Sequence, residues 1–141
     1  QLARASYVTA AARGLLEQTA EHVRTREQFG RAVGSFQAVA HPLADCSIAL
    51  GSASALCRIA ASRMAQESRR GVALRGSVAA ALASATEASL RTSYACHQAL
   101  GAIGITIEGP AFHVTRKLRQ LASRQPDAST ERQRVLASMQ I

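Results

Sequence analysis

The stretch RTREQFGRAVGSFQAV, residues 24–39, interrupts an otherwise alanine-rich helical pattern. Two glycines, Gly30 and Gly34, divide it. Glycine adopts backbone conformations that end a helix, and it lets the chain approach a ligand closely. The arginines beside the glycines add positive charge. We therefore interpret the stretch as a basic connection between two long helices.

Long helices are predicted on both sides of this connection. The first runs from about Leu2 to Arg26, because its apolar residues recur three or four positions apart. The second follows Ser35, whose side chain can cap it, and Pro42 falls in its first turns. Its apolar stripe alternates steps of four and three residues, which is typical of helices packed almost parallel in a bundle. The stripe consists of Val39, Leu43, Cys46, Leu50, Ala53, Cys57, Ala60 and Met64.

The remainder of the chain continues the helical pattern. We find no internal repeat and no strand-like alternation longer than a few residues. The predicted fold is all-α, an antiparallel up-and-down bundle of about four helices with a short extra helical segment, in one domain over residues 1–141. The predicted segments are a polar turn at 67–71, a helix from about Val72 to Leu100, a glycine-rich loop at 101–110, a helix from about Ala111 to Ser123, a turn at 124–127 and a helix from Ser129 to Gln140.

Composition agrees with one helical domain. Hydrophobic residues make up 48% of the chain, which excludes a disordered class. No apolar run reaches the roughly 20 residues that a membrane span needs, and no signal peptide is recognised. Cys46, Cys57 and Cys96 have no metal-ligand spacing and fall inside helical patterns. We therefore expect reduced core thiols, no metal and a cytoplasmic protein.

The basic residues are the second compositional signal. The net charge is +8, and 16 of the 17 basic residues are arginine. The planar fork of arginine suits phosphate, so nucleic acid or a phosphate-bearing cofactor is a candidate partner. A GC-rich genome produces the same excess without any ligand. Arg26 itself has two interpretations: it binds a diphosphate, or it is a solvated arginine favoured by the helix dipole.

Two motifs in the chain resemble segments of the acyl-CoA dehydrogenases, in the C-terminal helical domain of that family. The pattern R-x-Q-F-G-x-x-I/V-x-x-F-Q matches the run from Arg26 to Gln37. The pattern Q-x-x-G-G-x-G-F/I-x-x-E matches the run from Gln98 to Glu108, with Ala102 in place of the second glycine. The resemblance covers essentially the whole chain. It implies N-terminal helical and middle β-domains outside this chain, FAD between the β-domain and the bundle, and dimer or tetramer interfaces built by the bundle.

The resemblance also assigns roles to individual residues, toward the FAD of a neighbouring subunit. Arg26 would pair with the pyrophosphate, while Gln28 and Phe29 would line the adenosine end. The methyl group of Ala102 is tolerable if its φ is negative, and Glu108 is expected to have a structural or interface role. The predicted FAD-binding residues are Arg26, Gln28, Phe29, Gln37, Gln98, Gly101 and Gly104.

A carboxylate base is the remaining element that the resemblance implies. It would remove an α-proton from an acyl-CoA thioester while a β-hydride passes to the flavin. Asp127 occupies that position, with a side chain one methylene shorter than the usual Glu. The alternative is that Asp127 only caps the last helix, whose first turn contains Ser129, Thr130 and Glu131. Ala128 and Glu131 stand where the family favours Gly and Gln.

Three functions follow from these features. The first is the C-terminal domain of an FAD-dependent acyl-CoA dehydrogenase of fatty acid or steroid catabolism, acting on acyl-CoA with the help of further domains in a homo- or hetero-oligomer. The second is a non-catalytic subunit that completes a partner's FAD site. The third is a basic helical domain that binds nucleic acid or has a regulatory role. The arginines are spread over all predicted helices and do not form one stripe, which argues against the third.

Overall fold

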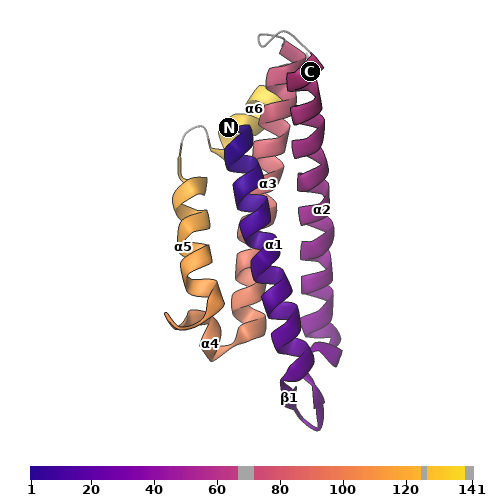
Figure 1. Ribbon diagram of the computed structural model, residues 1–141, viewed down its shortest axis with the longest axis vertical. Helices are drawn as coiled ribbons and strands as arrows, with labels where there is room; N and C mark the ends of the chain where they lie inside the picture. The colour runs from indigo at the N-terminus through magenta and orange to yellow at the C-terminus, as the bar shows by residue number, and fades with distance from the viewer. Residues whose placement is uncertain (67–71, 125–126, 139–141) are drawn as a thin grey trace.

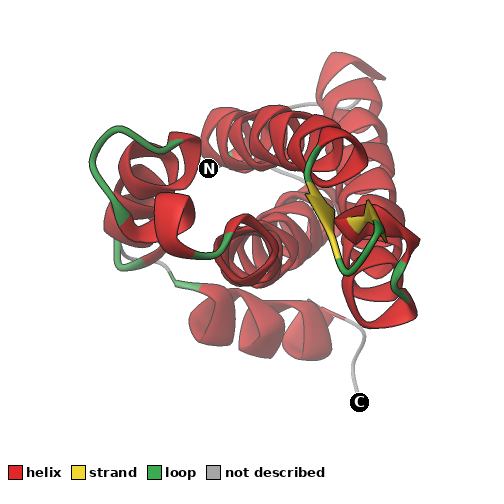
Figure 2. Cartoon of the chain, turned by 90° about the horizontal axis from the view of Figure 1, so that it is seen from below, coloured by secondary structure: helices red, strands yellow, loops and turns green. Residues whose placement is uncertain are grey.

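Four long helices run along the same axis, and each runs antiparallel to the previous one in the chain (Figure 1). They belong to a computed structural model that describes residues 1–66, 72–124 and 127–138. A further helix crosses the outer side of the bundle, against one of the long helices (Figure 2). The all-α prediction is confirmed. The helices are α1 (Leu2–Thr25), α2 (Gln37–Gln66), α3 (Val72–Leu100), α4 (Ala102–Ile105), α5 (Pro110–Ala122) and the crossing helix α6 (Ala128–Ser138).

The inner face of α2 follows the predicted stripe closely. The central six of its eight residues are buried, from Leu43 to Ala60. Val39 is half-buried and Met64 is 47% exposed, because each lies near an end of the helix. Pro42 lies inside α2, in its second turn. The 4–3 spacing therefore identified the packed seam of the helix correctly.

Helix α3 occupies the centre of the bundle, in contact with α1, α2, α5 and α6. Small side chains line it on several sides, and Leu82 is fully buried among them. Two buried hydroxyls of α3 bond to their own helix, Thr92 Oγ1 to the carbonyl of Ala88 and Ser93 Oγ to that of Leu90, both at 2.8 Å, whereas the buried Ser89 Oγ has no partner among the described residues. This bonding removes the penalty of burying an unpaired polar group. Alanine and serine on α3 let four helices approach one axis closely.

Local structure between the helices differs from the predictions at three points. Ser35 does not cap α2: it lies in a 3-10 turn, η1 (Val33–Ser35), and its hydroxyl donates to the carbonyl of Ala32. Residues 101–110 contain the short helix α4 and are not loop throughout. A two-stranded ribbon, β1 (Glu27–Gln28) and β2 (Arg31–Ala32), follows α1. The turn predicted at 67–71, residues 125–126 of the next turn and the last residues to Gln140 lie outside the described residues.

The sequence showed no apolar run long enough to span a membrane, but helix α2 differs from that expectation. By length and composition alone it is apolar enough to cross a membrane, and 33% of its most apolar window is buried. A core helix of a bundle passes the same test when its outer face carries few charges. The composition of α2 therefore reflects apolar residues on its outer face as well as in its core seam.

All three cysteines are buried and none forms a disulfide, as predicted for core thiols. Burial raises the pKa of the Cys96 thiol to about 11, and it also raises the pKa of Cys57. Because the thiolate is the reactive form, we expect Cys96 in the native chain to resist iodoacetamide at pH 8, while Cys57, which borders an open hollow between α1 and α2, reacts first. Mass spectrometry of alkylated peptides, with and without urea, measures this order; equal native rates would contradict it.

Candidate functional site

The connection between α1 and α2 is a β-hairpin. Glu27 pairs with Ala32 and Gln28 pairs with Arg31 in antiparallel register. The turn residues Phe29 and Gly30 both have positive φ, 56° and 76°, as a type I′ turn requires. The Val33 N–H donates to the carbonyl of Arg26 at 2.8 Å and closes the base of the hairpin. The glycine motif therefore builds a rigid projection from one end of the bundle.

Phe29 is the most unusual residue of this projection. Its side chain is 92% exposed, and it is the one non-glycine residue with positive φ among the described residues. A bulky residue in this conformation is strained, and such strain clusters at functional sites. The Phe29 ring meets the Phe36 ring edge to face at 6.2 Å, and the Arg31 guanidinium lies 4.0 Å from the centre of the Phe36 ring. The hairpin thus presents an aromatic face with a cation beside it.

The predicted phosphate ligand Arg26 lies at the base of the hairpin. It follows the last residue of α1, has an extended backbone and is exposed. Within the described part of the chain no carboxylate pairs with it, whereas its neighbour Arg24 pairs with Glu21. The Gln28 side-chain amide donates to the Glu27 carbonyl at 2.7 Å. Arg26 therefore places a positive charge on an exposed edge, with no counterion from the described residues, which suits an anionic ligand.

The second predicted motif lies at the end of α3. Gln98 is exposed in the last turn, and Gly101 ends the helix with a φ of 63°. Gly104 is buried, and a Cβ there would lie 2.9 Å from the His97 carbonyl oxygen. Each of these two glycines is thus required by geometry, one by its φ and one by close packing. Ala102 lies in α4 and has no positive φ, so its methyl group is tolerated as predicted.

Helix α5 holds this second motif in place. His97 Nε2 lies 2.9 Å from the Thr115 hydroxyl, which ties the end of α3 to α5. His113 Nε2 lies 3.1 Å from the Ile107 carbonyl oxygen. Glu108 is exposed in the same segment. Three isoleucines here are also exposed, so the segment presents an apolar surface beside Gln98; they are Ile103, Ile105 and Ile107.

The structure brings the two predicted cofactor motifs to one end of the bundle, whereas α6, which Asp127 immediately precedes, lies toward the other end (Figure 1). The hairpin, Gln37 at the start of α2 and the α3–α4 turn share the end seen in Figure 2. Asp127 precedes α6, near the beginning of α1. The 24 residues of α1 separate the two ends by about 36 Å. The predicted base and the predicted adenosine-binding residues therefore do not belong to one continuous cleft in this chain.

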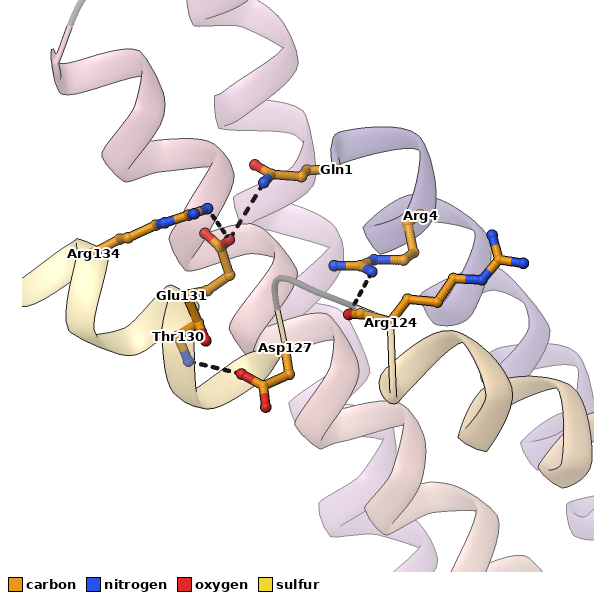
Figure 3. Close-up of polar contacts among 7 residues, drawn as sticks. All are labelled: Gln1, Arg4, Arg124, Asp127, Thr130, Glu131 and Arg134. Carbon is orange, nitrogen blue, oxygen red and sulfur yellow. Dashed lines mark hydrogen bonds and ion pairs between the residues drawn. The ribbon is translucent and has the colours of Figure 1, made fainter.

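Asp127 caps α6. Its Oδ1 accepts a 2.9 Å bond from the Thr130 backbone N–H (Figure 3). That N–H, followed by the Thr130 hydroxyl, lowers the pKa of the Asp127 carboxyl below its ordinary value. A carboxylate stabilised in this way is a weaker base than one without such bonds. The capping interpretation is thus supported by geometry, while a role as base stays a prediction.

The cap is expected to make stability depend on pH. Because the pKa of Asp127 is lower in the folded chain, its contribution is present at neutral pH and is lost as the pH falls below about 4. Asp127→Ala should therefore destabilise the chain at pH 7 and make less difference in acid. Urea unfolding of the wild type and of Asp127→Ala, at several pH values from 7 down to below 4, measures the difference in their free energies of unfolding. Asp127→Asn, which keeps an acceptor oxygen, is the control; a difference that grows in acid would contradict the cap.

Glu131 is a residue whose place the sequence did not reveal. It is fully buried, although the pattern suggested only a favourable residue in the first turn of α6. Its Oε1 accepts from Arg134 at 2.6 Å and from the Gln1 side chain at 3.4 Å (Figure 3). Its Oε2 is buried with no partner among the described residues. The spacing Glu131–Arg134 signals an ion pair on one helix, but nothing in the sequence signals its burial.

The fold and the two glycine motifs together define a class of protein. The family model for the acyl-CoA dehydrogenase C-terminal domain matches residues 2–134. The chain belongs to the acyl-CoA dehydrogenase family, within its C-terminal domain. A curated relative, acyl-CoA dehydrogenase FadE27 of Mycobacterium tuberculosis, is 67% identical over 30 residues, which are 21% of this chain and 8% of that protein.

Solved structures have the same fold over nearly the whole chain. A chain of the ChsE4-ChsE5 complex from Mycobacterium tuberculosis superposes with a TM-score of 0.90, at 29% identity, over 99% of this chain and 37% of that one. A chain of the Tcur3481-Tcur3483 steroid ACAD G363A variant gives 0.90 at 27% identity, over 99% and 37%. The chain thus spans little more than a third of the solved chains that it resembles.

Proposed function

We propose that this chain is the part of an FAD-dependent acyl-CoA dehydrogenase that holds the adenosine diphosphate end of a neighbouring subunit's FAD. The observation that carries the proposal is the hairpin, where the exposed, strained Phe29 stands beside Arg26, a cation with no paired carboxylate among the described residues. An exposed ring suits stacking on an adenine, and an exposed guanidinium suits a diphosphate. FAD, the cofactor that the resemblance to the family implies, carries both groups.

The α3–α4 turn fits the same ligand from a second element. Gly101 leaves room for close backbone approach, and Gln98 offers an exposed amide at the same end of the bundle. Both motifs would therefore bind the same nucleotide. The exposed isoleucines of residues 103–107 would form part of the interface with the subunit that holds it. Glu108 has an interface role in this arrangement. The oligomer, homo- or hetero-, is then a requirement for a complete FAD site.

In this proposal Asp127 acts at the FAD site of a different subunit, because α6, which it caps, lies toward the opposite end of the bundle from the two glycine motifs. When bound, FAD would supply the acceptor for the β-hydride of an acyl-CoA thioester. The chain itself would contribute the Asp127 carboxylate, at the N-terminal cap of α6, as the group that accepts the α-proton. The acyl-CoA and the reactive part of the flavin are bound largely by further domains. One bundle thus contributes to two FAD sites, one at each end.

Flavin retention tests the nucleotide site. The protein is purified with its native neighbours, and the ratio of flavin to protein absorbance is recorded. We expect Arg26→Gln to lower FAD occupancy at least tenfold at fixed FAD concentration, because a diphosphate loses its counterion. Arg24→Gln is the matched control, since this nearby exposed arginine already pairs with Glu21. Equal flavin retention in the two variants would falsify the assignment of Arg26.

Bleaching of the flavin by an acyl-CoA tests Asp127. Asn caps helices as well as Asp does, so Asp127→Asn keeps α6 in place and removes only the base. We expect bound FAD, unchanged stability and loss of bleaching. Bleaching that survives this change would point to a non-catalytic subunit that completes a partner's FAD site. The lowered pKa of Asp127, and solved relatives that are complexes of two different proteins, favour that second function.

A further inference from the structure

An open hollow of about 310 Å³ lies between α1 and α2, which run side by side along the bundle (Figure 1). The first half of α1 and the second half of α2 line it. It therefore lies away from the hairpin, which joins the other ends of these two helices. Its volume is at the lower end of the range for small-molecule sites. We call it the α1–α2 hollow.

Two arginines from different helices line this hollow. Arg13 comes from α1 and Arg58 from α2, and both are exposed. Neither pairs with a carboxylate of the described residues, and even Glu17, one turn along α1 from Arg13, forms no ion pair with it. Two guanidinium groups without counterions raise the positive potential of the hollow, so they favour an anion there.

Arg58 is held at the edge of the hollow by its own helix. Its Nη1 donates to the hydroxyl of Ser54, one turn earlier, at 2.9 Å, and Ser54 also lines the hollow. This bond uses one of the five N–H donors of the guanidinium, so further donors remain for a ligand. A side chain that is already oriented loses less entropy when it binds an anion.

The other side chains that line the hollow are small, and the surface that they expose is mostly apolar. Ala10 of α1 and Ala61 of α2 contribute methyl groups, and the Cys57 thiol borders the same space. The Thr9 hydroxyl already donates to the carbonyl of Ala5 at 2.9 Å. Because apolar surface favours hydrocarbon over water, the hollow suits a ligand that carries an apolar group beside its charge.

We infer that the α1–α2 hollow binds a small amphipathic anion, which is a carboxylate or phosphate group on a short hydrocarbon chain. The anionic group accepts hydrogen bonds from Arg13 and Arg58, and the chain lies against Ala10, Ala61 and the Cys57 thiol. Carboxylate and phosphate both match the guanidinium fork, so they share this chemistry. The site does not depend on the proposed function, because none of its lining residues belongs to the hairpin, the α3–α4 turn or α6.

Protection of Cys57 from alkylation tests the site. A ligand in the hollow covers the thiol, so millimolar sodium hexanoate or hexyl phosphate is expected to slow the reaction of the full chain with iodoacetamide about fivefold near saturation. The anion that protects at the lower concentration identifies the preferred charged group. Hexanamide has the hydrocarbon chain without the charge, and inorganic phosphate has the charge without the chain, so each should protect much less. Equal protection by hexanamide or by inorganic phosphate, or none by either amphipathic anion, would overturn the inference.

Two arginine variants test the contact with the anion. Arg13→Gln and Arg58→Gln should each raise the anion concentration needed for protection about tenfold, because each loses a charge-assisted hydrogen bond. Arg116→Gln is the matched control, since it removes the same charge from an exposed position on α5, outside the hollow. Each alkylation rate is divided by that of the same variant without ligand, and an unreactive Cys96, which is fully buried, shows that the variant is folded.

Equal protection in all three variants would overturn the role of the two arginines. If either variant exposes Cys96, the comparison of hexanoate with hexanamide on the wild type decides the matter without it.

Flavin retention separates this inference from the proposed function. When purified with its native neighbours, the protein with Arg13→Gln or Arg58→Gln should keep the FAD occupancy of the wild type, whereas Arg26→Gln should lower it and keep the protection by the anion. Protein without FAD that still shows protection contradicts the proposed function alone. Bound FAD without protection contradicts the site in the α1–α2 hollow alone.

Discussion

Arg134→Met is expected to lower the free energy of unfolding by about 3 kcal/mol, at the lower end of the cost of stranding a buried charge. The Glu131 carboxylate is fully buried, and Arg134 is the cation bonded to its Oε1. Without that cation, only the long 3.4 Å bond from Gln1 remains among the described residues. Urea unfolding of the full chain measures the change.

The same helix offers a matched control. Arg132 pairs with Glu87, but both side chains are about 60% exposed. Exposed pairs contribute little, so Arg132→Met should cost less than about 1 kcal/mol. Glu131→Gln combined with Arg134→Met should recover most of the loss, because no charge is then buried. Equal costs for the two arginine variants would show that Glu131 is solvated in the native state.

Gly109→Ala is the second change with a large expected effect, about 3 kcal/mol of destabilisation, the upper end for overpacking. The φ at Gly109 is −78°, so backbone strain is not the cause. A Cβ there would collide with the carbonyl oxygen of Ile103, which is rigid backbone. The segment between α4 and α5 would have to move. Thermal unfolding of the variant measures the cost.

Gly14→Ala controls for the type of change. Gly14 lies inside α1, and a Cβ there would meet nothing within 4 Å. Replacing glycine by alanine in a helix interior favours folding by about 0.5–1 kcal/mol. We therefore expect the two Gly→Ala variants to shift the melting temperature in opposite directions. A Gly109→Ala protein as stable as the wild type would mean that the α4–α5 segment adapts at low cost.

Helix periodicity predicted much of the fold. The predicted first helix ended one residue beyond Thr25, where α1 ends, and α3 has the predicted bounds of Val72 and Leu100. The α4 helix was missed because it is only four residues long, too short for a 3.6-residue period to be recognised. The hairpin was missed because its strands have two residues each and its turn uses Phe29 where Asn is preferred. A long helix is still recognised when a few of its residues depart from the periodic pattern, whereas a segment of two to four residues is too short to show a pattern.

The candidate site could be predicted only as a set of residues. The glycine motifs pointed to Arg26, Gln98, Gly101 and Gly104, and the structure gathers their elements at one end of the bundle. Their contacts with FAD stay predictions. Asp127 was left open between cap and base, and the bond from Thr130 supports the cap. Glu131 was predicted only as a favourable residue in the first turn of the last helix, and its burial became evident only from the packing of α6 against α3.

The sequence by itself determined which segments are helical, which faces of them are apolar, and which family the glycine motifs resemble. These properties depend on residues a few positions apart, so local spacing carries them. The tertiary structure decided that the two glycine motifs share one end, that α6, which Asp127 caps, lies toward the other, and that Glu131 is buried. Each of these depends on how helices far apart in the chain pack against α3, and no local pattern encodes that arrangement.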